Sequence, residues 1–195
     1  MRILSGKLRG SKILTNNNKT KGSEDFITRP TSDRVKETLF NIVQHGFNID
    51  FANVSFFDCF AGSGAIGLEA ISRGCLSVSF LEKNNAACEC IQKNLANFNL
   101  NANGSGLGYR ILNYDFFDKD LLLDNEFDVV FLDPPYEMAR VSEVFLRLKE
   151  LRVTKKNSLI IYESNKELVK VDRLEIIKSR KIGKTQLSFL KVLNS

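Results

Sequence analysis

The chain has 195 residues and a formal net charge of +5, and 43% of its residues are hydrophobic, which suits one ordinary globular domain. No stretch approaches the roughly 20 apolar residues of a membrane span, and the first residues lack the apolar segment of a signal peptide. The four cysteines lack the spacing of a zinc site. We therefore expect a cytoplasmic protein with free thiols, no metal and no membrane partner.

The charges are unevenly distributed along the chain. Residues 1–34 hold eight Lys or Arg and three Asp or Glu, and residues 170–195 hold seven and two. Residues 35–169, in contrast, hold thirteen and eighteen. An acidic body with two basic ends predicts a polyanionic partner that contacts the termini, while the chemistry lies in the body. Ordinary solvated lysines are the alternative explanation.

The N-terminal residues predict a small basic extension. Residues 1–14 combine glycines with basic and apolar residues, a pattern typical of a hairpin. Thr31 or Ser32 can cap a helix that runs to about Gln44, with an apolar face at helical spacing. We therefore expect an extension over residues 1–50 and a main domain over residues 51–195.

Beyond residue 51, short β-branched or aromatic runs alternate with helical patterns. The expected strands are 54–57, 78–81, 109–112, 129–132, 158–162, 174–179 and 186–193. The expected helices are 65–73, 84–97 and 141–151. This alternation predicts an α/β fold with a mostly parallel, doubly wound sheet that a C-terminal antiparallel hairpin closes.

A glycine-rich loop joins the first of these strands to its helix. Gly62-x-Gly64-x-x-Gly67 matches the dinucleotide-binding fingerprint. Glu82 ends the next strand, where an acid that binds a ribose belongs. A nicotinamide-dependent oxidoreductase is therefore one hypothesis for this chain.

Asp58 at the mouth of the loop argues against that hypothesis. A carboxylate there repels the phosphate that a helix N-terminus would bind, and it suits a cationic ligand such as S-adenosylmethionine. Capping of the helix by Asp58 is compatible with this. Asp115 follows the 109–112 strand, where its carboxylate can accept from an adenine amine, and Phe116 or Phe117 can cover the ring. A solvated acid beside two core phenylalanines is the alternative.

The strand at 129–132 stops at Asp133, Pro134, Pro135 and Tyr136. Neither proline can continue the ladder, because each lacks a backbone N–H. Asp133 therefore lies at the carboxyl end of a central strand, where open α/β sheets bind their ligands. Together with the proline carbonyls and a flat aromatic face, it can grip a planar group that carries an NH2. A simple proline-terminated turn is the alternative.

In combination, these motifs resemble the class I S-adenosylmethionine-dependent methyltransferases that modify exocyclic amines. The Asp-Pro-Pro-Tyr motif (DPPY) is shared with DNA adenine methyltransferases. The N-terminal motifs R-I-x-S-G-x-x-R-G, from Arg2, and R-P-T-x-x-R-V-x-E-x-x-F-N, from Arg29, are more specific. They are similar to the bacterial 16S rRNA guanine-N2 methyltransferase family, the RsmD type, over essentially the whole chain.

The resemblance implies a Rossmann-like class I methyltransferase fold and methyl transfer from S-adenosylmethionine to N2 of one guanine in 16S rRNA, during assembly of the 30S subunit. Nothing in the sequence requires more than a monomer. The implied cofactor-binding residues are Asp58, Phe60, Ala61, Gly62, Ser63, Gly64, Glu82, Lys83, Asp115 and Phe116. The implied catalytic residues, which hold the base, are Asp133, Pro134, Pro135 and Tyr136. The expected RNA-binding residues are Arg2, Lys7, Arg9, Arg29, Thr31 and Arg34.

Two alternatives stay open. A methyltransferase for another amine, such as adenine N6 of DNA or RNA or a protein amide, would share every motif of the body. A nicotinamide-dependent oxidoreductase or a non-catalytic RNA-binding module would differ in which cofactor, if any, it binds.

Overall fold

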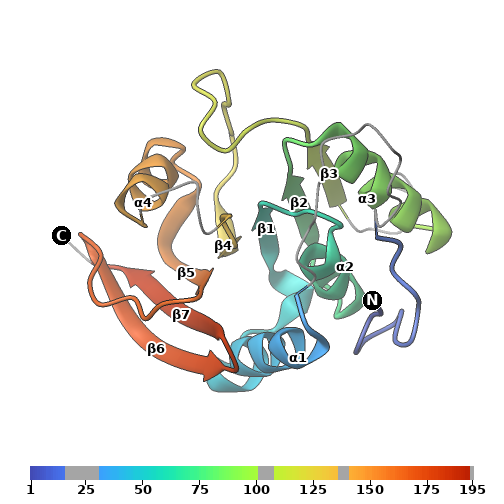
Figure 1. Cartoon of the computed structure of the whole chain (residues 1–195), viewed down its shortest axis with the longest axis horizontal. Coiled ribbons are helices and arrows are strands. Elements are labelled where there is room, and N and C mark those ends of the chain that lie inside the picture. Colours follow the sequence, from blue (N-terminus) through green and yellow to red (C-terminus); the bar gives the residue numbers. More distant parts are fainter. Residues whose placement is uncertain (16–30, 101–107, 136–140, 194–195) are drawn as a thin grey trace.

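The computed structural model describes residues 1–15, 31–100, 108–135 and 141–193 (Figure 1). Within these residues, seven strands form one sheet in the order β3-β2-β1-β4-β5-β7-β6. The strands are β1 (Ser55–Cys59), β2 (Ser77–Leu81), β3 (Gly108–Leu112), β4 (Phe127–Leu132), β5 (Thr154–Ser164), β6 (Leu174–Ile182) and β7 (Thr185–Val192). The helices are α1 (Asp33–Asn41), α2 (Ala65–Ser72), α3 (Asn85–Asn97) and α4 (Val141–Glu150), with short helical turns η1 (Ile42–Gly46) and η2 (Phe51–Asn53).

The sheet has the predicted topology. Strands β1 to β5 pair in parallel, whereas β7 is antiparallel to both β5 and β6. The chain moves outward from β1 through β2 to β3 and then returns to β4 on the other side of β1. This reversal between β1 and β4 is a topological switch point, where open α/β sheets bind ligands beyond the carboxyl ends of their strands.

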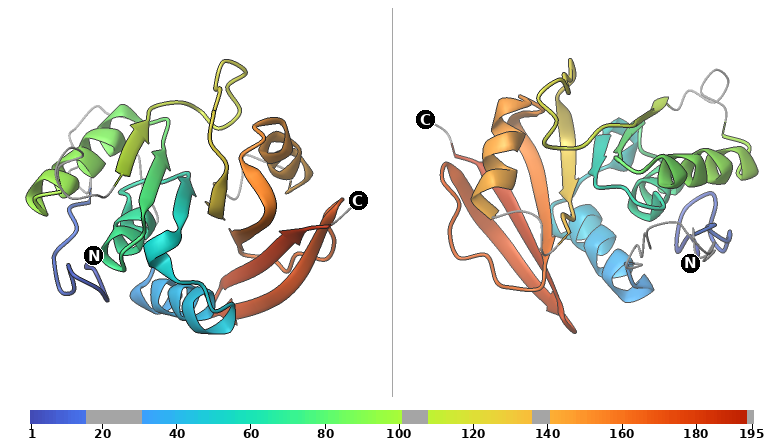
Figure 2. Two further views of the ribbon diagram at one scale, coloured as in Figure 1. Left: turned by 180° about the vertical axis from the view of Figure 1, so that it is seen from behind. Right: turned by 45° about the horizontal axis from the view of Figure 1, so that its top comes forward.

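The central strands contribute alternate residues to two core layers. Phe56 and Phe131 lie in a layer with apolar residues of α1, α2 and α3, whereas Phe57 and Val130 lie in a layer with residues of α4. Figure 2 shows these helices on opposite sides of the central strands. The predicted doubly wound α/β fold is therefore confirmed. None of the described helices is long and apolar enough to cross a membrane.

Residues 1–15 fold back on themselves beside α2 and α3 (Figure 1). Their only antiparallel bridge joins Arg2 to Lys12, so the expected hairpin consists mainly of turns. Ile3 and Ile13 are buried in the core layer that α2 and α3 share. This extension therefore rests on the same core as the sheet, and the expected boundary at residue 50 stays a prediction.

Helix α1 begins as expected and ends differently. The Ser32 hydroxyl accepts a hydrogen bond from the Val35 N–H at 3.3 Å, which caps the helix. The regular helix ends at Asn41, three residues before the expected end, and the chain continues as the wider turn η1. There the Phe47 N–H donates to the Ile42 carbonyl, because five-residue spacing has replaced four-residue spacing.

Candidate active site

A cavity of about 500 Å³ lies at the switch point, beyond the carboxyl ends of the parallel strands. One side, the glycine-loop wall, comes from β1, β2 and the loop after β3. Its residues include Asp58, Phe60, Ala61, Gly62, Ser63, Glu82, Lys83, Asp115 and Phe116. The other side, the hairpin wall, comes from the ends of β4 and β5, the turn from β6 to β7 and the N-terminal extension. Its residues include Met1, Thr31, Ser32, Asp133, Pro134, Pro135, Glu163, Lys184 and Thr185.

Glu82 anchors the glycine loop. One of its carboxylate oxygens, Oε2, accepts a hydrogen bond from the Gly62 N–H at 2.8 Å, and the other, Oε1, accepts one from the Asn84 N–H at 2.8 Å. A carboxylate can accept about four hydrogen bonds in all, so Glu82 can still serve the hydroxyl groups of a ligand. Gly64 lies outside the cavity lining and forms the left-handed N-cap of α2, with φ 77°.

Phe60 has an unusual backbone conformation beside the cavity. Its φ is 71°, a left-handed value that bulky residues rarely adopt. The N–H groups of Phe60 and Ala61 both donate to the Leu81 carbonyl, at 3.0 and 2.9 Å, and so hold the turn in place. The Phe60 ring lies 4.9 Å from the ring of Phe116. Strained residues of this kind cluster at functional sites, which agrees with the position of Phe60 on the wall.

Asp58 lies at the base of the cavity and is only 1% exposed. Its Oδ2 accepts a hydrogen bond from the Gly67 N–H at 2.9 Å, so it does cap the first turn of α2. Burial raises the pKa of Asp58 to about 7, and the charges of Asp133 and Glu82 add to this, whereas the Gly67 N–H opposes it. A nearby cation would favour the ionised form, so this group suits a positively charged ligand.

The helix end that would hold a pyrophosphate is already occupied by acids. Backbone N–H groups of a glycine loop normally point at the phosphates of a dinucleotide. Here the N–H groups of Gly62 and Gly67 donate to the carboxylates of Glu82 and Asp58. The glycine-loop wall therefore disfavours a dinucleotide and accommodates a ligand with positive charge and hydroxyl groups.

Asp115 and Phe116 form the outer part of the glycine-loop wall. Asp115 Oδ2 lies 3.3 Å from Lys83 Nζ, and Asp115 Oδ1 accepts from the Phe117 N–H at 3.0 Å. The Phe116 ring is 2% exposed and packs in the core layer of α4. Of the two phenylalanines expected in the core, Phe116 is buried there, whereas Phe117 is exposed. Asp115 and Phe116 both line the cavity, and their contact with an adenine stays a prediction.

Asp133 and Pro134 begin the hairpin wall directly after β4. Asp133 is half-buried, Pro134 is buried and Pro135 is exposed. The charge of Asp133 raises the pKa of Asp58, so the two carboxyl groups share the interior of the cavity. Tyr136 lies outside the described residues.

The sequence analysis missed several residues of the hairpin wall, among them Met1, Glu163, Lys184 and Thr185. Glu163 had a usable signal, because it follows the apolar run 158–162 as Asp133 follows the run 129–132. Lys184 lies in an ordinary turn sequence, and its place in the cavity comes from the antiparallel pairing of β6 and β7.

Three of the expected RNA-binding residues surround a second cavity of about 340 Å³: Arg2, Arg9 and Arg34. All three are exposed, and the Arg2 guanidinium lies 3.4 Å from Asp33. Thr31 lines the first cavity, so the extension reaches both. Lys7 lines neither of these two cavities. Arg29 lies outside the described residues.

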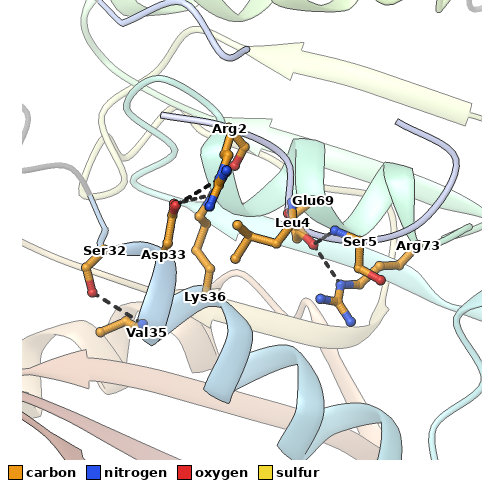
Figure 3. A network of polar contacts seen from close by, with 9 residues as sticks. All are labelled: Arg2, Leu4, Ser5, Ser32, Asp33, Val35, Lys36, Glu69 and Arg73. Carbon is orange, nitrogen blue, oxygen red and sulfur yellow. Dashed lines mark hydrogen bonds and ion pairs between the residues drawn. The ribbon is translucent and has the colours of Figure 1, made fainter. Parts of the chain in front are cut away.

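A buried lysine ties residues 1–15 to α1. Lys36 is fully buried, and its ammonium donates to the Arg2 carbonyl at 2.5 Å and lies 3.6 Å from Asp33 (Figure 3). Burial lowers the pKa of Lys36, whereas the charges of Glu69 and Asp33 oppose this. The contact fixes Arg2 at the N-terminal end of α1.

A buried glutamate ties the same segment to α2. Glu69 is fully buried and accepts hydrogen bonds from the N–H groups of Leu4 and Ser5, at 2.7 and 3.0 Å (Figure 3). The Arg73 guanidinium, 2.9 Å away, balances its charge. Removing one member of a buried charged pair is strongly destabilising, so this arrangement holds the extension firmly beside the cavity.

Comparisons with known proteins agree over nearly the whole chain. Residues 1–191 match the family described as conserved hypothetical protein 95. A Haemophilus influenzae protein named ribosomal RNA small subunit methyltransferase D is 33% identical over 187 residues, which are 94% of this chain and 89% of that protein. The solved structure of yhhF from Escherichia coli has a TM-score of 0.76 and 27% sequence identity to this chain. The alignment covers 99% of this chain and 98% of the yhhF chain.

A more distant structure shares the fold alone. The T. thermophilus 16S rRNA N2 G1207 methyltransferase, solved with AdoMet and guanosine, has a TM-score of 0.61 and 15% identity. The alignment covers 85% of this chain and 45% of that one.

Proposed function

The chain belongs to the family of ribosomal RNA small subunit methyltransferase D, and from this premise we propose that it transfers a methyl group from S-adenosylmethionine to the exocyclic N2 of one guanine in 16S rRNA. The observation that carries the proposal is one cavity with two different walls. An acid-capped glycine loop forms one wall, and Asp133 and Pro134, at the end of the neighbouring strand, belong to the other.

The glycine-loop wall fits S-adenosylmethionine, whose groups are an ammonium, a sulfonium, a ribose and an adenine. Asp58 would face the cationic amino-acid part, and Glu82 would accept hydrogen bonds from the ribose hydroxyls. Asp115 and Phe116 would hold the adenine. The remaining loop residues, Phe60 to Gly64 and Lys83, would form the surroundings of the bound S-adenosylmethionine.

Bound there, S-adenosylmethionine supplies a methyl group on a positively charged sulfur and departs as the neutral thioether. A guanine N2 lone pair is delocalised into the ring and is a poor nucleophile. Asp133 and the Pro134 carbonyl would each accept one N2 hydrogen, which turns the lone pair out of the ring plane and toward the methyl carbon. N2 then carries the new N–C bond and loses one proton, which Asp133 or water can accept. No strong base is needed.

The RNA must present its guanine as an unstacked base. Flipping a base from a helix costs a few kcal/mol, and stacking on an aromatic ring such as Tyr136 returns roughly 1–3 kcal/mol. Phosphate contacts from Arg2, Arg9 and Arg34 would supply the remaining free energy that base flipping costs. Thr31, which lines the first cavity, would lie close to the flipped base. Lys7 and Arg29 would extend this contact along the RNA.

The T. thermophilus protein shows only that a chain with this fold can be a 16S rRNA N2 methyltransferase. We further propose that the substrate is the assembling 30S subunit and that the enzyme acts as a monomer. The cytoplasmic location expected from the sequence follows from such a substrate and stays a prediction.

The test is methyl transfer from labelled S-adenosylmethionine to small-subunit particles from a strain that lacks this enzyme, with the modified nucleoside identified by mass. N2-methylguanosine is expected. Asp133→Ala should lower the rate by about 100-fold or more, because it removes an interaction made with the reacting group, while cofactor affinity changes only a few-fold. Asp124→Ala, in an exposed position outside the cavity, is the matched control.

Two results would contradict the proposal. N6-methyladenosine as the product would keep the Asp133 chemistry but change the substrate. Transfer by Asp133→Ala at the native rate would refute the mechanism.

A further inference from the structure

Besides the half-buried Asp133, the hairpin wall contains a buried carboxylate that the proposed transfer does not use. Glu163 lies at the carboxyl end of β5, is 5% exposed and lines the same cavity as Asp133. A carboxylate offers about four acceptor sites, so Glu163 can serve a ligand in addition to its protein neighbours. Burying an acid is costly, and its position beside the reacting group therefore calls for a chemical reason.

Strand register places Glu163 in a row with Asp133. Leu132 of β4 pairs with Tyr162 of β5, and both side chains lie in the core layer of α4. Because side chains alternate along a strand, Asp133 and Glu163 face the opposite side, toward α1 and α2. On the next strand, β7, Leu187 pairs with Glu163, and Thr185, two residues earlier, begins the strand and lines the cavity on the same face. With neighbouring strands about 4.8 Å apart, Asp133 and Glu163 lie close enough to contact adjacent positions of one purine ring.

The side chain of Lys184 is a cationic donor at the edge of the same cavity, and Asp133, Glu163 and Lys184 are called the row below. Lys184 is exposed and lines the cavity from the two-residue turn between β6 and β7. Gly183, the other residue of this turn, has φ 61°, which suits a tight hairpin turn. The pairing of Ile182 with Thr185 fixes the turn at its base. The hairpin therefore presents the lysine from a defined position at the edge of the cavity.

We propose that Glu163 and Lys184 determine the choice of base by contacting the Watson–Crick edge of the target guanine. The inference rests on the proposed guanine-N2 transfer. That edge presents the N2 amine, then the N1–H donor, then the O6 acceptor. With N2 at Asp133, Glu163 accepts from N1–H and Lys184 donates to O6.

The same side chains, Glu163 and Lys184, disfavour the binding of adenine. Its N1 is an acceptor and would face the Glu163 carboxylate, and its 6-amino group would face the Lys184 ammonium. Both contacts oppose binding, because a site built to pair with specific donors and acceptors is left with unpaired polar groups by the wrong base. Unstacked bases in RNA are commonly read on this edge.

The analogue 2,6-diaminopurine separates base reading from chemistry. It carries the reactive 2-amine of guanine but has an acceptor at N1 and an amine at position 6. Once the target nucleotide is mapped, the RNA is assembled by ligation with guanosine or 2,6-diaminopurine riboside at that position. The wild-type enzyme should prefer guanine, and Glu163→Gln should lower the ratio of guanine to diaminopurine rates by roughly 10- to 100-fold. The Gln amide can donate to the N1 acceptor, which the carboxylate cannot do.

The rate ratio does not depend on how much of the variant is folded, and S-adenosylmethionine affinity should stay within a few-fold of the native value. Lys184→Met, at an exposed turn, is the second variant and should also lower the ratio. Glu126→Gln, an exposed glutamate just before β4, is the matched control and should leave it unchanged.

The outcomes distinguish the two proposals. If wild-type enzyme forms N2-methylguanosine and both variants keep the native ratio, base reading by this row is wrong while the proposed function stands. If wild-type enzyme forms no N2-methylguanosine, both proposals are overturned.

Discussion

The titration of Asp58 provides a test of whether the proposed cofactor site binds a cationic ligand. Its carboxyl is buried and its pKa is raised to about 7, chiefly by burial. A cation in the cavity favours the ionised form and lowers that pKa. Binding of S-adenosylmethionine below pH 7 should therefore release a proton, and affinity should increase as the pH rises toward 8.

The size of the effect follows from the titration. With a pKa of about 7, Asp58 is roughly 3% ionised at pH 5.5 and roughly three quarters ionised at pH 7.5. If the bound form is ionised throughout, affinity should rise about 25-fold over this range. Asp58→Asn removes the titrating group, and its amide oxygen can still accept from the Gly67 N–H. The variant should bind more weakly and lack this component of the pH dependence.

Isothermal titration calorimetry gives both quantities. The affinities of the wild type and Asp58→Asn are measured from pH 5.5 to 7.5. Because titration of the ligand's own amine affects both proteins equally, it cancels in the ratio of the two affinities. Repeating the titration at pH 6 in two buffers with different ionisation enthalpies counts the protons released, and close to one is expected for the wild type. Parallel pH profiles with equal proton release would refute the assignment of Asp58 to the cationic part of the ligand.

The same group should make stability depend on pH in the free protein. The pKa of Asp58 is raised above 3.8 on folding, so its favourable contribution is present at low pH and is lost as the pH rises through about 7. Between pH 5 and pH 8 this loss amounts to roughly 3 kcal/mol. Urea unfolding should show the free energy of unfolding of Asp58→Asn rising relative to the wild type over that range. A constant difference would contradict the raised pKa.

Two further predictions concern the N-terminal extension. A Cβ at Gly6 would lie 1.8 Å from the Ser72 carbonyl oxygen, whereas at Gly10 nothing lies within 4 Å, and both residues have positive φ. Gly6→Ala should therefore lower the free energy of unfolding by about 2 kcal/mol more than Gly10→Ala, and equal losses in denaturant titrations would disprove the close approach. Arg34→Ala should weaken rRNA binding and reduce the magnitude of the salt-dependence slope by about 0.7 to 0.9 without changing cofactor affinity. Arg152→Ala, at an exposed position just before β5 and outside both cavities, should not have these effects. Identical slopes for the two arginine variants would refute the arginine contact.

Local sequence patterns were sufficient for the order of elements and for much of the glycine-loop wall. Short apolar runs separated by helical periodicity predict a parallel sheet, because buried parallel strands and amphipathic helices have different repeats. Asp133 was placed correctly at a strand end because two prolines end the ladder there. The position of Asp58 at the mouth of the glycine loop and the spacing of Glu82 from Gly62 predict that both acids lie in the site, and both line the cavity, whereas their contacts with a ligand stay predictions.

The hairpin wall and the anchoring of the extension depended on contacts that no local pattern encodes. Glu163 and Lys184 join Asp133 only because β5 pairs beside β4 and the β6–β7 hairpin returns antiparallel to it. Likewise, Glu69 resembles an ordinary helix-surface acid in sequence, yet it is fully buried where it accepts the N–H groups of residues 4 and 5. Strand register and long-range burial decide such positions, because they bring together residues whose separation along the chain carries no periodic signal.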